Sequence, residues 1–181
     1  TGQYCDKALF NYLRKEFPHT LVTAFVCDSY YIPKVLLKPY IFVSTHAADG
    51  PHYPGIGHPG SSGTFPKLIG HYVRDERIMK LMEAIKKITI LPAERFKIKN
   101  KGWIGLGADA DIVIFDFDII IDNADHPGSG LPDAPPNGIE YVIVNGEVII
   151  ENNFIYKNKK AGKLLKCTQR LQENNCYSPF P

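Results

Sequence analysis

The 181-residue chain lacks the features that mark several common protein classes. It contains no stretch of about 20 apolar residues, so we expect no membrane-spanning helix and no membrane partner. Its formal net charge of +2 at pH 7 is too small to indicate a nucleic-acid partner. The four cysteines form no Cys-x-x-Cys motif, which argues against a zinc knuckle or a thioredoxin-like redox site.

The start of the chain also lacks a basic segment followed by an apolar block, so we expect no secretory signal and a cytoplasmic protein. Reduced cysteines suit that compartment, although pairing of Cys5 with Cys27 or of Cys167 with Cys176 stays open. The basic cluster Lys157–Lys166 is expected to be a solvated tail rather than a phosphate-binding patch. With 44% hydrophobic residues, the chain has the composition of a globular protein.

The first half of the chain shows α/β patterning. Apolar residues at helical spacing predict a helix over Tyr4–Phe17, which Pro18 ends. Two short apolar runs, Thr20–Val26 and Tyr40–Ser44, predict buried strands, and Ser29–Leu37 predicts a short helix between them. Strand, helix and strand in this order predict a βαβ unit with parallel strands.

Three more helices are expected before residue 97. The first spans Phe65–Arg74, and the last is a single turn over Leu91–Phe96 with Pro92 near its start. Asp75 is expected to cap the middle helix. The apolar face of that helix is predicted to contain Ile78, Leu81, Met82, Ile85 and Ile88.

Short strands are predicted in the second half of the chain. They span Asp111–Phe115, Ile119–Ile121, Ile139–Val144 and Glu147–Glu151. Asn145-Gly146, between the last two, predicts a type I′ hairpin turn. The Pro/Gly-rich segment Asp122–Asn137 is expected to be a loop. A β-rich module of this size is too small to be stable alone, so we expect it to pack on another part of the protein.

The most unusual segment is the loop His46–Lys67, which is rich in glycine, proline and histidine. Long loops in compact domains are usually functional. Asp49 follows the second predicted strand, and acids at the C-terminal ends of such strands are typical of α/β-barrel active sites. The simpler alternative is an Asp-Gly turn residue. His46, His52 and His58 lack the spacing of metal ligands, so a metal cluster built from them is not favoured.

Five blocks of the sequence share their order with one known family. They are Asp49-Gly50, His58-Pro59 followed by Gly63-Thr64-Phe65-Pro66, Ile90–Phe96, Gly107–Asp116 and Gly138–Glu147. In this order they resemble the C-terminal portion of the amidohydrolase superfamily, specifically its D-aminoacylase (N-acyl-D-amino-acid deacylase) branch. The resemblance implies an α/β fold made of the last strands and helices of a TIM barrel and a small β-sandwich part. The barrel part is expected at 1–96, the sandwich part at 97–166 and a tail at 167–181.

The resemblance also implies an activity. It implies that the parent protein is a zinc-dependent hydrolase of linear amides, whose small-molecule substrate is an N-acyl-D-amino acid. Asp49 matches the catalytic aspartate, which moves a proton between the attacking water and the leaving amine. Tyr53, His58 and Lys67 are the candidate substrate-binding residues. The chain has no His-x-His motif, so the main zinc ligands are expected upstream of it. The chain alone is therefore expected to be inactive and to hold no zinc tightly.

Two departures from the family pattern concern the site. Gly60 stands where the family has an arginine that pairs with the substrate carboxylate, which makes an uncharged amide an alternative substrate. Counting from Pro39 places His46 at the position of the catalytic acid, whereas counting from His58 places Asp49 there. We prefer Asp49, because loops absorb insertions and the downstream match is longer.

Two alternative functions stay open. The chain could be a non-catalytic fragment or interaction domain without the metal site, or part of a cyclic-amide hydrolase resembling hydantoinase or dihydroorotase. Open strand edges make self-association a further expectation. Trp103 is predicted to anchor the two parts of the chain against each other, and His71 and His126 are predicted to be surface residues.

Overall fold

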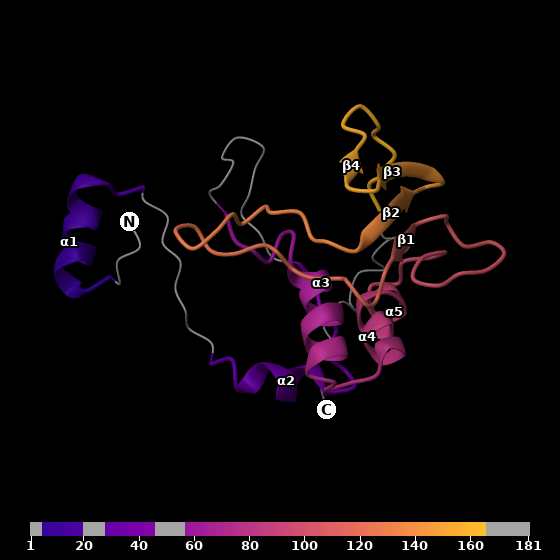
Figure 1. The fold of residues 1–181 in the computed structure, drawn as a ribbon, viewed down its shortest axis with the longest axis horizontal. Coiled ribbons are helices and arrows are strands. Elements are labelled where there is room, and N and C mark those ends of the chain that lie inside the picture. Colours follow the sequence, from indigo (N-terminus) through magenta and orange to yellow (C-terminus); the bar gives the residue numbers. More distant parts are fainter. Residues whose placement is uncertain (1–4, 20–27, 46–56, 166–181) are drawn as a thin grey trace, which may run out of the picture.

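The computed structural model describes residues 5–19, 28–45 and 57–165, with helices in the first half and an antiparallel sheet in the second (Figure 1). The helices are α1 (Lys7–Glu16), α2 (Tyr31–Leu36), α3 (Thr64–Lys67), the π-helix η1 (Leu68–Asp75), α4 (Leu81–Ile88) and α5 (Ile90–Arg95). The strands are β1 (Ile112–Phe115), β2 (Ile139–Val144), β3 (Glu147–Glu151) and β4 (Phe154–Ile155). The predicted strand at 20–26, the loop residues 46–56 and the tail lie outside the described residues. No helix in the described part has the length and apolar character needed to cross a membrane.

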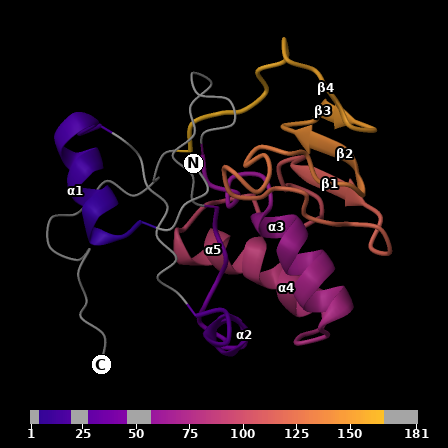
Figure 2. The same cartoon turned by 60° about the vertical axis from the view of Figure 1, so that its left-hand side comes forward.

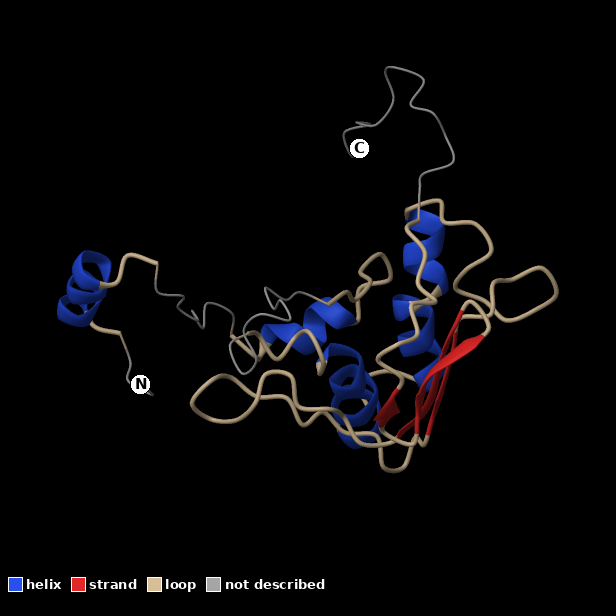
Figure 3. Cartoon of the chain, turned by 90° about the horizontal axis from the view of Figure 1, so that it is seen from above, coloured by secondary structure: helices blue, strands red, loops and turns tan. Residues whose placement is uncertain are grey.

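Helix α1 confirms the first predicted helix and begins with a side-chain cap. The Asp6 carboxylate accepts a hydrogen bond of 2.7 Å from the backbone N–H of Leu9, which satisfies one of the free donors of the first turn. None of its residues is buried, and Figures 1 and 3 show it well apart from the other helices and the sheet. Phe10 of α1 and Phe17, which follows the helix, are exposed, and Leu9 and Leu13 are partly exposed.

The prediction of a strand over Tyr40–Ser44 is wrong. Tyr40 lies in a turn, and residues 41–45 form no ladder with any described strand. Instead the Val43 N–H donates to the carbonyl of Lys87 at 3.2 Å, and the Phe42 ring meets Phe96 edge-on at 5.6 Å. A strand needs a neighbouring strand to pair its backbone, and the neighbours here are α4 and α5. The βαβ unit is thus not formed within the described residues.

Buried Lys87 fixes the segment that leads into the loop His46–Lys67. Its ammonium group donates to the carbonyls of Lys38 at 2.6 Å and of Ile41 at 2.9 Å. Burial lowers the pKa of Lys87 below its usual range, because an apolar environment disfavours the charged form. The two carbonyls compensate for part of that cost and hold residues 38–41 against α4.

Helices α3 and η1 run without interruption over the region predicted as a helix, and the chain changes from α to π at Leu68. Leu68, Ile69 and Val73 supply their buried side. The C-terminal bond from the Glu76 N–H to the His71 carbonyl, 2.9 Å, has the five-residue spacing of a π-helix.

The next helix starts later than predicted. Asp75 ends η1 and does not cap α4, whose first turn is closed by the Glu83 carboxylate accepting the Lys80 N–H at 3.1 Å. The helix buries Ala84 completely, while Met82, predicted on its apolar face, is 71% exposed. Ala84 packs with Leu36, Leu68, Val73 and Met79 in the helical core. Helix α5 confirms the predicted single turn, with Pro92 as its third residue.

The sheet has the strand order β1-β2-β3-β4, with every neighbouring pair antiparallel (Figure 2). Asn145 and Gly146, with φ of 48° and 83°, confirm the predicted type I′ turn. Strand β4 was not predicted, although Asn152 and Asn153 form a second tight turn with φ of 46° and 66°.

The prediction of a strand over Ile119–Ile121 is wrong, since this region makes a turn and one isolated bridge to Asn137. A second sheet, which a sandwich requires, is absent from the residues described.

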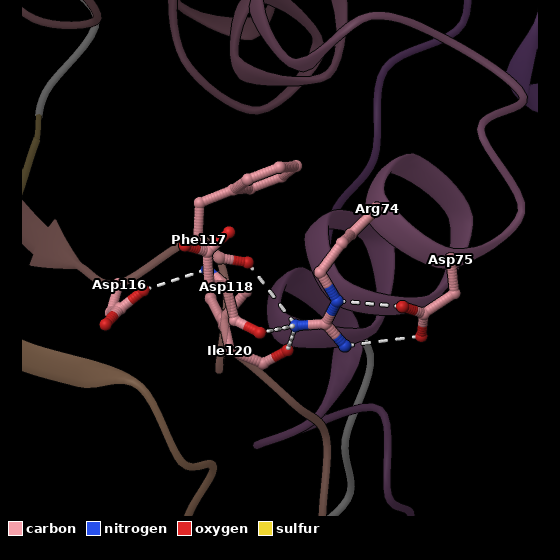
Figure 4. Close-up of polar contacts among 6 residues, drawn as sticks. All are labelled: Arg74, Asp75, Asp116, Phe117, Asp118 and Ile120. Carbon is pink, nitrogen blue, oxygen red and sulfur yellow. Dashed lines mark hydrogen bonds and ion pairs between the residues drawn. The ribbon is translucent and has the colours of Figure 1, made fainter.

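The helical part and the sheet part are joined through Ile120 and Arg74 (Figure 4). Ile120 is 1% exposed. Nη1 of Arg74 donates to the carbonyls of Phe117, Asp118 and Ile120 at 3.4, 3.2 and 2.6 Å. The other nitrogens of the guanidinium donate to Asp75, and this contact lowers the pKa of the Asp75 carboxyl. One side chain of η1 therefore orders the turn that follows β1.

Trp103 does not make this junction. Trp103 is exposed, and its ring lies over Gly105. A glycine has no Cβ, so the indole can lie close to the backbone there. The contacts of Arg74 with residues 117–120 bridge the two parts.

A second ion-pair cluster fixes the β2–β3 hairpin. The Asp111 carboxylate accepts the Asn145 N–H at 2.7 Å and binds the ammonium of Lys101, which also pairs with Asp109 at 3.1 Å. The hydrogen bond from Lys101, followed by that from the Asn145 backbone, lowers the pKa of Asp111.

Replacing Asp111 with asparagine should change how the free energy of unfolding depends on pH in the acid range. The folded pKa of Asp111 lies below its ordinary value of 3.8, so its contribution is complete above that pH and is lost as the pH falls through the folded pKa. Because the site is partly exposed, we expect a loss of at most about 1 kcal/mol at neutral pH and a flatter curve below about pH 4. Urea unfolding between pH 7 and pH 2 measures both. An equally steep acid limb in D111N and wild type would contradict this role.

Candidate functional site

The structure locates two of the four predicted site residues. Asp49 and Tyr53 lie outside the described residues, as do His46 and His52. His58 is an exposed residue of the turn that precedes α3, and Lys67 is the exposed last residue of that helix. The described residues therefore locate the downstream side of the candidate site.

The turn at residues 58–63 is held by its own hydrogen bonds. Nδ1 of His58 accepts the Gly60 N–H at 2.9 Å, and the Pro59 carbonyl accepts the Gly63 N–H at 2.9 Å. The Thr64 hydroxyl then donates to the Gly60 carbonyl at 2.7 Å. Proline followed by glycine favours such a turn, because proline fixes φ and glycine adds no steric restriction. The turn leads directly into α3, for which Gly63 is the N-cap residue.

The segment 122–137 lies against this turn. The rings of His58 and His126 meet at right angles, with centroids 5.2 Å apart. The Ser62 hydroxyl donates to the carbonyl of Pro132 at 3.3 Å. A Cβ at Gly63 would lie 2.0 Å from a carboxylate oxygen of Asp122, so any larger residue there would require the Asp122 side chain to move.

His126 is thus half-buried beside the turn, and its prediction as a surface residue is wrong. It lies 68 positions after His58, and spacing along the chain did not relate the two. One signal was available, because His58 and His126 each begin a His-Pro-Gly-Ser tetrapeptide. Both tetrapeptides close a four-residue turn, with Ser61 and Ser129 donating to the carbonyl of the respective histidine at 3.0 Å.

The charged side chains of these two segments are acidic. Residues 57–66 contain no lysine or arginine, and neither does 122–137, which contains Asp122, Asp125 and Asp133. An arginine at the position of Gly60 would provide a fork for a carboxylate, and glycine provides only its backbone N–H, which His58 already binds. The turn therefore offers a carboxylate no cationic partner, and the first cationic side chain beyond it is Lys67.

The described residues do not fit a zinc centre. Within residues 5–19, 28–45 and 57–165, no group of three or more histidine, cysteine, aspartate or glutamate side chains could hold a metal ion. A structural or catalytic zinc site uses at least three protein ligands. The pair His58 and His126 therefore forms no such centre by itself.

Comparisons with known proteins place this arrangement in a family. The model of the amidohydrolase family matches residues 48–150, which is more than half of the chain. N-acyl-D-glutamate deacylase from Alcaligenes xylosoxydans xylosoxydans is 40% identical over 89 residues, covering 49% of this chain and 18% of that protein. D-aminoacylase from the same organism is 34% identical over 123 residues, covering 67% of this chain and 24% of that protein.

A solved structure agrees with the sequence matches. It is a mutant D-aminoacylase in complex with copper chloride, 31% identical, with a TM-score of 0.68 over 76% of this chain and 28% of that one. The chain thus spans between 18% and 28% of the length of these relatives. The family match covers the region of Asp49, the described turn, strands β1 and β2 and all but the last residue of β3. The chain belongs to the amidohydrolase family.

Proposed function

We propose that this chain forms the C-terminal part of a metal-dependent amidohydrolase that hydrolyses a linear amide, with N-acyl-D-amino acids as the substrate class. The observation that carries the proposal is the family match over residues 48–150, together with relatives named as deacylases of N-acyl-D-amino acids. In this assignment residues 1–96 belong to a TIM barrel, 97–166 to a β-sandwich and 167–181 to a tail. The proposed location is the cytoplasm.

The proposal assigns Asp49 to catalysis. A carboxylate at this position can take a proton from the attacking water and return it to the leaving amine. Tyr53, His58 and Lys67 are assigned to substrate binding. The proposed zinc must take at least one of its ligands from outside the described ranges, because those ranges contain no group of three suitable side chains.

The structure of the turn bears on which amide is preferred. Gly60 adds no cation, and the adjoining segment carries only acidic charges, so a substrate carboxylate would gain little here. If Gly60 reflects a changed specificity, an N-acyl-D-amino acid should be a poorer substrate than its uncharged carboxamide. The measurement is kcat/KM for both compounds, in a protein that contains this chain together with the rest of the amidohydrolase fold.

Gly60→Arg tests this expectation, with Ser61→Arg as a control that adds the same charge one residue away. G60R should improve kcat/KM for the acid about 10- to 100-fold, mainly through KM, because a charged hydrogen bond is worth roughly 1.5–3 kcal/mol. S61R should change it far less. Equal preference for the acid in wild type and G60R would reject the altered specificity and leave the deacylase assignment standing. No turnover of either compound would count against the hydrolase proposal itself.

Self-association is also proposed. Ile104 and Leu106 are almost fully exposed, and Tyr31, Val35 and Leu37 of the α2 region are about half-exposed. Exposed apolar side chains of this number favour contact with another surface. Light scattering of the purified chain tests the proposal, and a single monomeric species at all concentrations would exclude it.

A further inference from the structure

The turn at 58–63 depends on a nitrogen that can change its protonation. Nδ1 of His58 accepts the Gly60 N–H at 2.9 Å, which requires a lone pair on Nδ1 and places the ring proton on Nε2. Protonation of the imidazole puts a hydrogen on Nδ1 as well, so that two donors would face each other. The bond can therefore form only while His58 is neutral.

Other bonds of the turn depend on the same residues. The Gly60 carbonyl accepts the Thr64 hydroxyl at 2.7 Å, and the His58 carbonyl accepts both the N–H and the hydroxyl of Ser61 at 3.0 and 3.1 Å. The bond to Gly60 comes from Thr64, which is the first residue of α3. A change in the orientation of Gly60 would therefore alter a hydrogen bond at the start of that helix.

The charged and titratable groups that adjoin the turn belong to the segment 122–137. From the segment 122–137, the His126 ring meets His58 at 5.2 Å, the Asp122 carboxylate lies against Gly63, and Asp125 accepts the His126 N–H at 2.7 Å. When both imidazoles are protonated they carry like charges, and the opposite charges in this segment lie on Asp122 and Asp125. Protonation thus opposes the contact between the rings as well as the bond to Gly60.

We propose that His58 is a positioning residue that acts through Gly60: its neutral ring holds the turn 58–63, and protonation of the ring releases it. The proposal does not rest on the hydrolase function, because it concerns the conformation of the turn. If the turn 58–63 lines a functional site, protonation of His58 would loosen that side of the site as the pH falls.

Two substitutions separate the hydrogen bond from the titration. His58→Asn supplies a side-chain oxygen that can accept the amide two residues on, as in an Asx turn, and that does not titrate near neutral pH. His58→Ala removes the acceptor. His71→Asn is the matched control, because His71 is an exposed histidine of η1 that pairs with Glu76 at 3.0 Å, away from the turn.

The test is solvent exchange of the Gly60 amide in the full chain by NMR at about pH 8 and about pH 5, each rate divided by the intrinsic rate at that pH. In wild type and H71N we expect protection to fall about ten-fold between the two pH values, the change that loss of one hydrogen bond produces. H58N should keep its protection within about two-fold at both pH values, and H58A should lack it at both.

Two results would overturn the proposal. One is a Gly60 amide that stays protected at the lower pH while the ¹⁵N shifts of His58 show a protonated ring. The other is H58N losing protection in parallel with wild type, which would assign the change to another group.

Discussion

Substitution of Gly138 by alanine should lower the free energy of unfolding by about 2–5 kcal/mol. Gly138 precedes β2 and has a φ of 79°, a left-handed conformation that disfavours any residue with a Cβ. A Cβ there would also lie 2.6 Å from the Cα and 2.7 Å from the backbone nitrogen of Ile120. Both effects oppose the variant, and backbone atoms cannot move aside as the end of a flexible side chain can.

The position of Ile120 explains why little relaxation is available. Helix η1 also approaches Ile120 so closely that a Cβ on Gly70 would lie 2.4 Å from the Ile120 carbonyl oxygen. The same oxygen accepts the guanidinium of Arg74 at 2.6 Å. The backbone of Ile120 is therefore in close contact with two glycines and with Arg74, which limits how far it can move.

Gly107→Ala is the control for this prediction. Gly107 has a φ of 92°, so it shares the left-handed cost, but nothing lies within 4 Å of its Cβ position. We expect G107A to cost only about 1–2 kcal/mol, and the difference between the variants measures the overlap with Ile120. Chemical unfolding of both at neutral pH gives the two values. If they agree within error, the close packing at Gly138 is not important for stability.

The elements that could be predicted from the sequence are those whose causes are local. Helix α1 needs only its apolar spacing and Pro18, and the β2–β3 hairpin needs only Asn145-Gly146 between two apolar runs. The family resemblance likewise came from short blocks such as Gly63–Pro66, and the match over residues 48–150 confirms it. In each case residues a few positions apart carry the information.

The errors occur where distant residues decide the structure. The run 40–44 has strand-like composition, yet α4 and α5 are its neighbours and supply no ladder. In Ile119–Ile121 only Ile120 is buried, against Gly70 and Gly138, while Ile119 and Ile121 are exposed, and no strand is formed. The contact of His58 with His126 joins positions 68 apart, and only the repeated His-Pro-Gly-Ser tetrapeptide related them. The catalytic assignment of Asp49 stays a prediction, since that residue lies outside the described part of the chain.

Asp49→Ala should abolish nearly all hydrolysis in a protein that combines this chain with the rest of the amidohydrolase fold. A general acid–base group contributes about 10²- to 10⁴-fold to a rate, so kcat should fall by about that factor. Substrate binding should change little, because a proton carrier acts on the reacting atoms. The metal content should also stay near that of the unmodified protein, because the main zinc ligands are expected outside this chain. The measurements are kcat and KM on an amide substrate, with elemental analysis of the same samples.

His46→Ala decides between the two ways of aligning the loop. Counted from Pro39, His46 would be the catalytic position, and counted from His58 that position is Asp49. If the count from His58 is correct, H46A should keep kcat within about ten-fold of wild type, while D49A loses nearly all of it. In that case His46 belongs to residues inserted before Asp49, and loops tolerate such insertions without loss of the catalytic acid. The reverse pattern would move the catalytic position to His46. Both an imidazole and a carboxylate can act as a general base, so residue type does not decide between His46 and Asp49. The kcat values of H46A and D49A do.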